Sequence, residues 1–226
     1  MTRGVREGSG LATRWPWIGR VQVAIRRRIV PLGPVAESLP ESGDFLEIGC
    51  GEGLVLQLLA SPQRSLTGID FDARKIKLAR TRLQDVPNLE LIQGEALAYL
   101  QDLPSDAFDA ILIVDTLSSF DPADQEKVLA ESRRLIRPNG CLVLKVIDGE
   151  AGWKTRLSRL LSGAVYRVFR LSASAGQRFT YLGEDALLQR LRAGGWAVQC
   201  RRLHRELHHP IPHLLFIARR PQEDPA

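Results

Sequence analysis

The chain alternates short apolar segments with segments of helical periodicity, and this alternation limits the folds it can adopt. Predicted strands cover residues 45–48, 65–69, 89–93, 108–114, 141–147, 197–203 and 213–219. Predicted helices cover residues 20–30, 34–39, 54–59, 72–84, 121–136 and 183–193. Asp72, which is better placed for this role than Asp70, and Asp121 are the predicted N-caps; Gly194 and Gly195 end the last helix, and residues 138–140 form a turn before the fifth strand. Strands joined by helices form parallel crossovers, and the helices then cover both faces of the sheet. We therefore expect an α/β fold built on one mostly parallel sheet.

Composition excludes several other classes of protein. With 44% hydrophobic and 25% charged residues, the chain of 226 residues has the balance of a globular domain. No apolar run approaches the roughly 20 residues that a membrane-spanning helix needs. Arg3 and Arg6 precede no apolar stretch with a cleavage site, so the N-terminus does not resemble a secretory signal. Three scattered cysteines form neither a disulfide framework nor a zinc pattern, which favours a reducing, cytoplasmic location.

Charge is unevenly distributed along the chain. Residues 1–40 carry seven Arg against two Glu, and residues 150–181 carry six bases against one Glu, so each segment has a net charge of +5. Residues 41–149 hold 18 acids against 11 bases, a net charge of −7. Basic segments favour the phosphate groups of nucleic acid or anionic lipid, although solubility alone also explains them.

The turn after the first predicted strand has the residues of a ligand site. Glu47 stands two residues before Gly49, and Gly51 and Gly53 follow. A glycine-rich turn from strand into helix lets a ligand approach bare backbone. A dinucleotide fingerprint would need glycine at the position of Leu54. The Glu47 carboxylate would repel a pyrophosphate, so the turn suits a cationic ligand.

Acidic residues also follow the next three predicted strands. Asp70 ends the second strand, 21 residues after Gly49, where a carboxylate can accept from both ribose hydroxyls. Glu95 follows the third strand and could accept from an adenine amine, or it could be a first-turn helix acid. Asp115 follows the fully apolar fourth strand at the carboxyl edge of the sheet, where ligands bind in open α/β folds.

As a set, these segments resemble the class I S-adenosylmethionine-dependent methyltransferases. The matching segments are LEIGCGEG (46–53), TGID (67–70), QGEA (93–96), FDAILIVD (108–115), RLIRPNGCLVL (134–144) and GGWAV (194–198). The resemblance implies a Rossmann-like seven-stranded methyltransferase sheet, mostly parallel with an antiparallel last strand, with helices on both faces. It also implies an enzyme, a methyltransferase, whose cofactor is S-adenosylmethionine.

The resemblance assigns roles residue by residue. The residues expected around the cofactor are Glu47, Gly49, Cys50, Gly51, Gly53, Asp70, Phe71, Glu95, Ala96 and Val114. Glu47 and the glycine backbone would hold the methionine part, and Asp70 would hold the ribose. Glu95 and Ala96 would lie near the adenine, although the family more often has Asp at the position of Glu95. Val114 and Asp115 would lie near the sulfonium.

A hydroxyl acceptor usually needs a general base as well as alignment. Asp115 and His213, both expected at the carboxyl edge of the sheet, are the candidate catalytic residues. The adjacent His208 and His209 do not easily share one ion and no acid cluster accompanies them, so we expect no metal. The segment after Asp115 lacks the two prolines and aromatic residue of adenine amino-methylases, and no cysteine follows a proline as in cytosine C5-methylases.

Two basic segments accompany the expected catalytic domain. We divide the chain into an N-terminal arm with helices (1–40) and a methyltransferase domain (41–226) that contains an inserted segment (149–181). In the inserted segment, apolar residues recur at helical spacing among arginines, which predicts an amphipathic lid over the acceptor site. A helix on an anionic membrane surface and a helix packed on the core are the alternatives. The expected acceptor contacts are Trp153, Lys154 and Arg156.

The sequence thus predicts O- or N-methylation of a small-molecule or lipid-like, amphiphilic acceptor. An RNA or protein methyltransferase and a non-catalytic cofactor-binding or membrane-associated protein remain alternatives. Nucleic acid is the less favoured partner, because aromatic residues make up only 6% of the chain and do not alternate with basic ones. Peripheral contact of a cytoplasmic protein with a membrane remains open.

Overall fold

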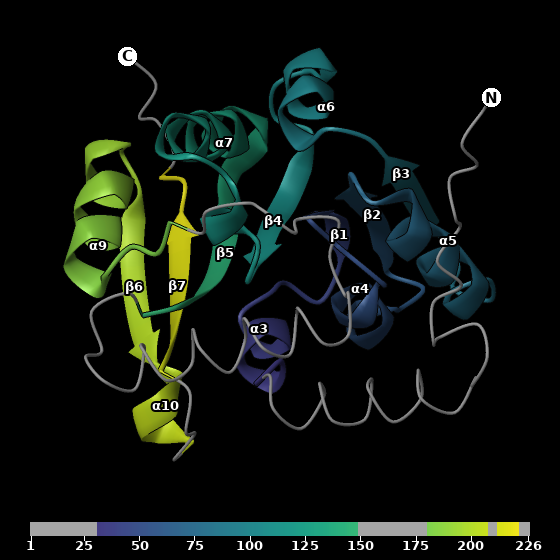
Figure 1. Cartoon of the computed structure of the whole chain (residues 1–226), viewed down its shortest axis with the longest axis horizontal. Coiled ribbons are helices and arrows are strands. Elements are labelled where there is room, and N and C mark those ends of the chain that lie inside the picture. Colours follow the sequence, from purple (N-terminus) through teal and green to yellow (C-terminus); the bar gives the residue numbers. More distant parts are fainter. Residues whose placement is uncertain (1–30, 149–179, 208–211, 222–226) are drawn as a thin grey trace, which may run out of the picture.

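A computed structural model describes residues 31–148, 180–207 and 212–221, and these residues form one seven-stranded sheet. The strands are β1 (Gly43–Ile48), β2 (Arg64–Asp70), β3 (Leu89–Gln93), β4 (Phe108–Val114), β5 (Ile136–Ile147), β6 (Ala197–Arg202) and β7 (His213–Arg219). Their order across the sheet is β3-β2-β1-β4-β5-β7-β6, which Figure 1 shows from right to left. β1 to β5 pair in parallel, whereas β7 is antiparallel to both β5 and β6. The predicted fold class is confirmed.

Helices pack on both faces of this sheet. They are α3 (Gly33–Glu37), α4 (Leu54–Leu59), α5 (Ala73–Arg82), α6 (Ala96–Asp102), α7 (Pro122–Leu135), α9 (Glu184–Ala193) and α10 (Leu203–Glu206), with a short 3₁₀ helix η1 (Leu117–Ser119). Alternate residues of β4 enter two separate cores. Ile111 and Ile113 pack with residues of α6, α7 and α9, whereas Ala110 and Leu112 pack with residues of α3, α4, α5 and α10.

Capping residues that the sequence predicts begin and end the longer helices. Asp72 is the N-cap of α5, and its Oδ1 accepts from the backbone N–H of Arg74 at 3.0 Å. Asp121 caps α7 in the same way, ahead of Pro122 in its first turn. α9 ends at Gly194, followed by Gly195 with a φ of 77°. These caps set where the crossover helices start and therefore which strand ends remain available to a ligand.

The structure corrects some predicted bounds. β5 begins at Ile136, not at residue 141, and the turn expected at residues 138–140 lies inside the strand. Asn139 takes a left-handed φ of 67° there, and the register between β4 and β5 shifts between Phe108 and Ala110. α6, η1 and α10 were not among the predicted elements.

The predicted N-terminal arm and inserted segment are described only in part. Within the arm, α3 begins near Gly33 and its Val35 is fully buried in the core beside α4. The predicted helix at 20–30 and residues 149–179 of the inserted segment lie outside the described residues. None of the described helices is long and apolar enough to cross a membrane.

Candidate active site

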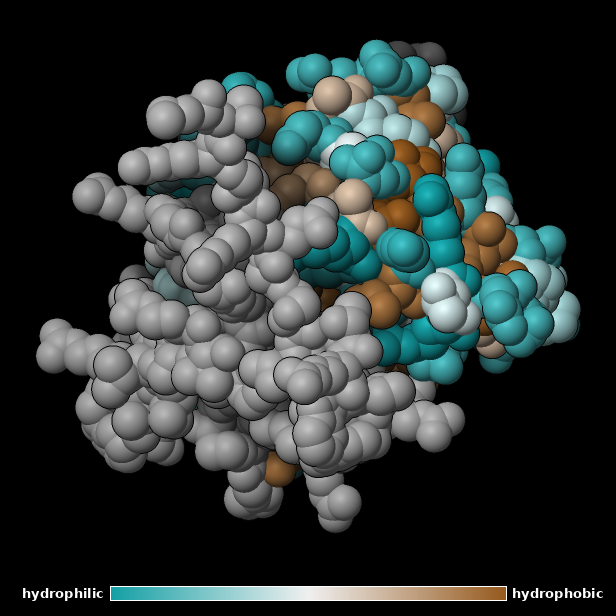
Figure 2. Space-filling model, turned by 45° about the vertical axis from the view of Figure 1, so that its right-hand side comes forward, coloured by the Kyte–Doolittle hydropathy of each residue, from teal (hydrophilic) through white to brown (hydrophobic). Residues whose placement is uncertain are grey.

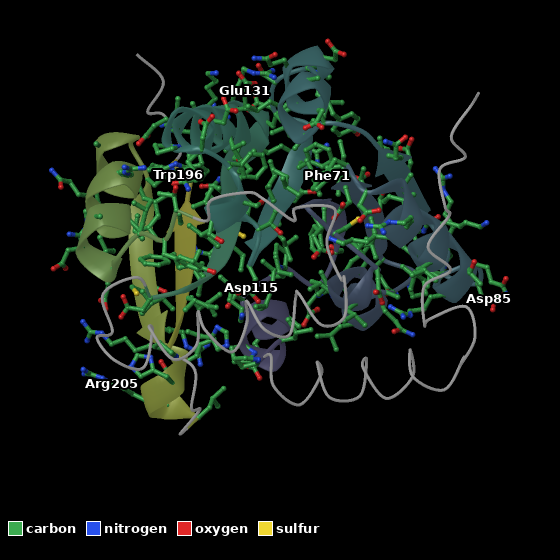
Figure 3. The ribbon with its side chains drawn as sticks, viewed as in Figure 1. Phe71, Asp85, Asp115, Glu131, Trp196 and Arg205 are labelled. Atoms are coloured by element: carbon green, nitrogen blue, oxygen red, sulfur yellow. The ribbon has the colours of Figure 1, made fainter. Side chains whose placement is uncertain are left out.

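The carboxyl ends of β1, β2, β3 and β4 bring most of the predicted site residues to one edge of the sheet. β1 leads into the glycine turn, β2 ends at Asp70, and β3 is followed by Glu95. Asp115 follows β4 and is labelled near the centre of Figure 3, below Glu131 and Trp196. Such an edge, where the strand order reverses, is the usual ligand site of open α/β sheets.

All three glycines of the turn have left-handed backbone angles. The φ values are 75° for Gly49, 56° for Gly51 and 73° for Gly53. A Cβ at Gly49 would lie 2.2 Å from Thr116 Cγ2, and one at Gly53 would lie 2.5 Å from Leu83 Cδ1. At Gly51 the nearest atoms would be 3.9 Å away, on Asp70 and Lys75. Gly49 and Gly53 therefore allow the turn to pack closely, whereas Gly51 leaves open backbone beside Asp70.

The Asp70 carboxylate is fixed by two backbone donors. Its Oδ2 accepts from the N–H of Gly51 at 2.9 Å, and its Oδ1 accepts from the N–H of Asp72 at 2.9 Å. Asp70 is 6% exposed, so this orientation is held inside the protein. Each carboxylate oxygen keeps a further lone pair, which is what two neighbouring hydroxyls of a ribose require. Asp72, not Asp70, is the helix cap, which removes the main structural alternative for Asp70.

Two buried carboxylates lie near the glycine turn. Glu47 in β1 is 2% exposed, and Asp70 accepts from the N–H of Gly51 in the turn. Burial, and then the charges of Glu47 and Asp70, raise the pKa of the Cys50 thiol well above its usual range. Cys50 is therefore a neutral, packed thiol, as the sequence suggests. The same two negative charges favour a cationic ligand at this turn and disfavour a phosphate.

The expected adenine side is more open to solvent. Phe71 is 38% exposed and is one of four exposed large hydrophobic side chains among the described residues. The Lys75 ammonium lies 6.0 Å from the centre of its ring. Glu95 is exposed at the N-cap position of α6, but its side chain makes no capping hydrogen bond. The face in Figure 2 shows such hydrophobic residues as small patches among hydrophilic ones.

Behind the end of β4, the structure adds a residue that the sequence reasoning missed. Lys145 of β5 is fully buried, and its Nζ donates to Oδ1 and Oδ2 of Asp115 at 2.9 and 2.8 Å. The same Nζ lies 3.2 Å from Nδ1 of His213, which is 2% exposed. The two candidate catalytic residues are therefore linked through one ammonium group.

A signal for Lys145 was present in the sequence. Residues 141–147 read as a strand of a sheet that helices cover on both faces, and such a strand has no solvent-facing side. A lysine in it predicts a buried ion pair, since an unpaired buried charge is too costly. The acid that pairs with it follows the neighbouring strand, as parallel pairing of Val114 with Lys145 places Asp115 alongside.

Some predicted residues cannot be placed. Trp153, Lys154 and Arg156 lie outside the described residues, as do His208 and His209. Within the described ranges, no three His, Cys, Asp or Glu side chains are grouped so that they could hold a metal ion. The roles of the predicted site residues remain predictions, which the geometry above makes specific.

Comparisons with known proteins agree with this geometry. A family model described as "Methyltransferase domain" matches residues 46–144, from the glycine turn to β5. A demethylmenaquinone methyltransferase from Thermotoga maritima is 28% identical in an alignment of 207 residues, gaps included, that covers 84% of this chain and 79% of that protein. A tRNA N(3)-methylcytidine methyltransferase from Drosophila melanogaster is 29% identical in an alignment of 123 residues that covers 50% of this chain but only 38% of that protein.

The fold has close counterparts among solved structures. A SAM-dependent methyltransferase from Methanosarcina mazei superimposes with a TM-score of 0.62 at 22% identity, covering 84% of this chain and 97% of that one. At this identity the likeness concerns the fold, whereas the sequence match over residues 46–144 includes the glycine turn and the ends of β2, β3 and β4.

Proposed function

Because the chain belongs to the class I S-adenosylmethionine-dependent methyltransferases, we propose that it methylates a small, amphiphilic organic acceptor. The observation that carries this proposal is the length of the match to the demethylmenaquinone methyltransferase, which includes 84% of this chain. The match to the family domain ends at residue 144, so the longer match includes segments outside that domain. The acceptor of that relative is a small molecule by its name, which supports the same class of acceptor here.

The residues of the glycine turn fit the cofactor, S-adenosylmethionine. When bound, this cofactor supplies a methyl group on a cationic sulfonium. Asp70, held by two backbone donors, is our candidate for the ribose hydroxyls. Glu47 and the open backbone at Gly51 are candidates for the cationic methionine part. Phe71 and Glu95, both exposed, are candidates for the adenine, which needs an apolar face and a hydrogen-bond acceptor.

A small hollow beside the ends of β4 and β5 has room for about one water molecule and marks the place next to which we propose that the acceptor binds. Its apolar lining comes from Leu117, Val146, Ile147, Leu182 and Leu187, and its hydroxyl groups come from Ser118, Thr180 and Tyr181. Thr180 is fixed there, since its N–H donates to the carbonyl of Ser118 at 2.9 Å and its carbonyl accepts from Gln125. The hollow begins two residues after Asp115, which we propose acts in catalysis together with His213.

Methyl transfer to a panel of acceptors tests the proposal. Methyl-labelled S-adenosylmethionine would be offered with demethylmenaquinone in oxidised and reduced form, a phenol without an apolar tail, and unmodified tRNA. We expect label in the organic-soluble fraction, more with the tailed acceptor than without a tail, and much less with Asp70→Asn at a subsaturating concentration of S-adenosylmethionine. Label in tRNA that ribonuclease removes, with none in the organic fraction, would instead establish the RNA methyltransferase alternative that the fly relative suggests.

A further inference from the structure

The link between Asp115 and His213 through Lys145 has a defined chemistry. Lysine carries three donors and no acceptor, whereas an ionised carboxylate only accepts. Nζ of Lys145 lies 2.9 Å from Oδ1 and 2.8 Å from Oδ2 of Asp115. These distances are typical of hydrogen bonds from a charged ammonium to a carboxylate. The third contact, to Nδ1 of His213 at 3.2 Å, then requires that Nδ1 accepts. A neutral His213 ring consequently carries its proton on Nε2.

Lys145 also holds the backbone of Asp115. Asp115 has a left-handed φ of 57°, which is uncommon for a residue other than glycine. Its N–H donates to the carbonyl of Lys145 at 2.8 Å, so the same lysine binds Asp115 through both main chain and side chain. Backbone outliers that the surrounding structure enforces are concentrated at functional sites. The direction of the Asp115 carboxylate is therefore fixed before any ligand arrives.

Stability alone is a weak explanation for this arrangement. A buried ion pair gains little over well-packed apolar residues, because removing two charges from water is costly. Lys145 occupies a central strand between β4 and β7, where its neighbours along the strand are the apolar Leu144 and Val146. An apolar residue would continue that pattern, so a charged side chain at this position suggests a role at the site that it contacts.

We propose that Lys145 is a positioning residue, which fixes the carboxylate of Asp115 at the acceptor site and keeps His213 in the tautomer protonated on Nε2. This role rests on the proposed methyltransferase function. It makes His213 a hydrogen-bond donor through Nε2, not the general base that the sequence alone suggests. Asp115 is then a carboxylate in a salt bridge with Lys145. It contributes to the reaction through its fixed orientation more than as a base.

Nitrogen NMR of the histidine side chains tests the tautomer in the unmodified protein. The chain has four histidines, and His213→Gln identifies the signal of His213 by its loss. We expect an unprotonated Nδ1 and a protonated Nε2 at neutral pH in the ligand-free protein. A proton on Nδ1 would overturn the proposal. This measurement needs neither cofactor nor acceptor, so its result is separate from the success or failure of the proposed function.

Variants of the pair then separate positioning from folding. Lys145→Met keeps most of the side-chain length without the charge, and Lys145→Met with Asp115→Asn removes both charges. We expect Lys145→Met to lower turnover about 100-fold, the scale of losing one placed donor, while S-adenosylmethionine binding changes little. The double variant should recover folding stability but not turnover. Full turnover in either folded variant, or a His213 tautomer unchanged by Lys145→Met, would overturn the proposal.

Discussion

Single residues of the glycine turn have different physical requirements. Gly49 needs both its left-handed φ and the absence of a side chain, because Thr116 occupies the space that a Cβ would take. The Thr116 hydroxyl lies 3.3 Å from the carbonyl oxygen of Gly49 and 3.1 Å from that of Val114, so its one proton is shared between the turn and the end of β4. Gly51 needs only its φ, since the space around it is open. The sequence pattern marks both positions as equal, and the structure distinguishes them.

Alanine substitutions should reveal this difference. Gly51→Ala should cost about 1–2 kcal/mol of stability, the penalty of a left-handed backbone with a side chain. Gly49→Ala should cost about 3 kcal/mol or more, because displacement of Thr116 adds to the same backbone penalty. Denaturant unfolding of the two variants measures both values. Equal losses in the two variants would contradict the assignment of the turn's packing to Gly49.

The residues at the strand ends were the most predictable part of the site. Glu47, Asp70 and Asp115 could be found from the sequence, since each lies within two residues of the carboxyl end of a strand, and these ends must lie at the same edge of the sheet. Lys145 was missed, although a lysine in a strand that helices cover on both faces already predicts a buried ion pair. His213 was found by position, but its ring contacts depend on antiparallel pairing that places β7 beside β5.

The longer helices whose caps are encoded in the local sequence could be predicted, whereas a helix that ends at a tertiary contact could not. α5 and α7 were found with their caps, Asp72 and Asp121, because the capping pattern is encoded within a few residues. α6 was missed, and its end depends on another helix. There, Arg134 of α7 donates to the carbonyls of Leu100 and Leu103 at 2.8 Å each. Such tertiary capping leaves no trace in the local sequence.

The cap of α5 makes stability depend on pH. The side-chain hydrogen bond from Arg74 is the main reason that the pKa of Asp72 lies below its ordinary value of 3.8. A carboxyl whose pKa is lower in the folded than in the unfolded state stabilises the protein when the pH is above the unfolded-state pKa. This contribution is lost as the pH falls from 3.8 through the folded-state pKa. Asp72→Asn should therefore be less stable than the wild type near neutral pH, and the two proteins should converge as the pH falls below 3.8, because asparagine never carries the charge. Asp72→Ala should cost about 1 kcal/mol at neutral pH.

Unfolding followed by circular dichroism between pH 3 and pH 7 measures these differences. Asp121→Asn is the matched control, because Asp121 caps α7 without an arginine at the same oxygen. The same acid dependence in Asp72→Asn and in the wild type would show that Arg74 does not hold the Asp72 carboxylate.

At the scale of the whole molecule, the two hydrophobic cores on the two faces of the sheet shield the three cysteines from solvent. Cys50 and Cys141 are buried, and Cys200 of β6 is half-buried. Burial is the main cause that raises the pKa of each thiol, to about 12 for Cys200. Little thiolate is then present near pH 8, and the thiolate is the reactive form. Burial within the fold, and not disulfide formation, therefore keeps the three thiols slow to react.

Thiol labelling should therefore report opening of the whole fold. We expect all three cysteines to react slowly with iodoacetamide at pH 8 in the native protein and quickly in denaturant. Because Cys50 lies within the glycine turn, S-adenosylmethionine should slow its labelling further, while Cys141 and Cys200 change less. Mass spectrometry of labelled peptides measures each site. Fast native labelling of Cys50, unaffected by the cofactor, would place the cofactor away from the turn.

The direct test of the central claim is calorimetric titration of S-adenosylmethionine into the wild type, Asp70→Asn and Asp72→Asn. The two aspartates are two residues apart and both buried, but only Asp70 accepts from the Gly51 backbone in the turn. We predict binding to the wild type and to Asp72→Asn, and about 10- to 100-fold weaker binding to Asp70→Asn, since hydrogen bonds to a charged group contribute about 1.5–3 kcal/mol. Equal affinity in all three folded proteins would contradict the claim that Asp70 and the glycine turn form the cofactor site.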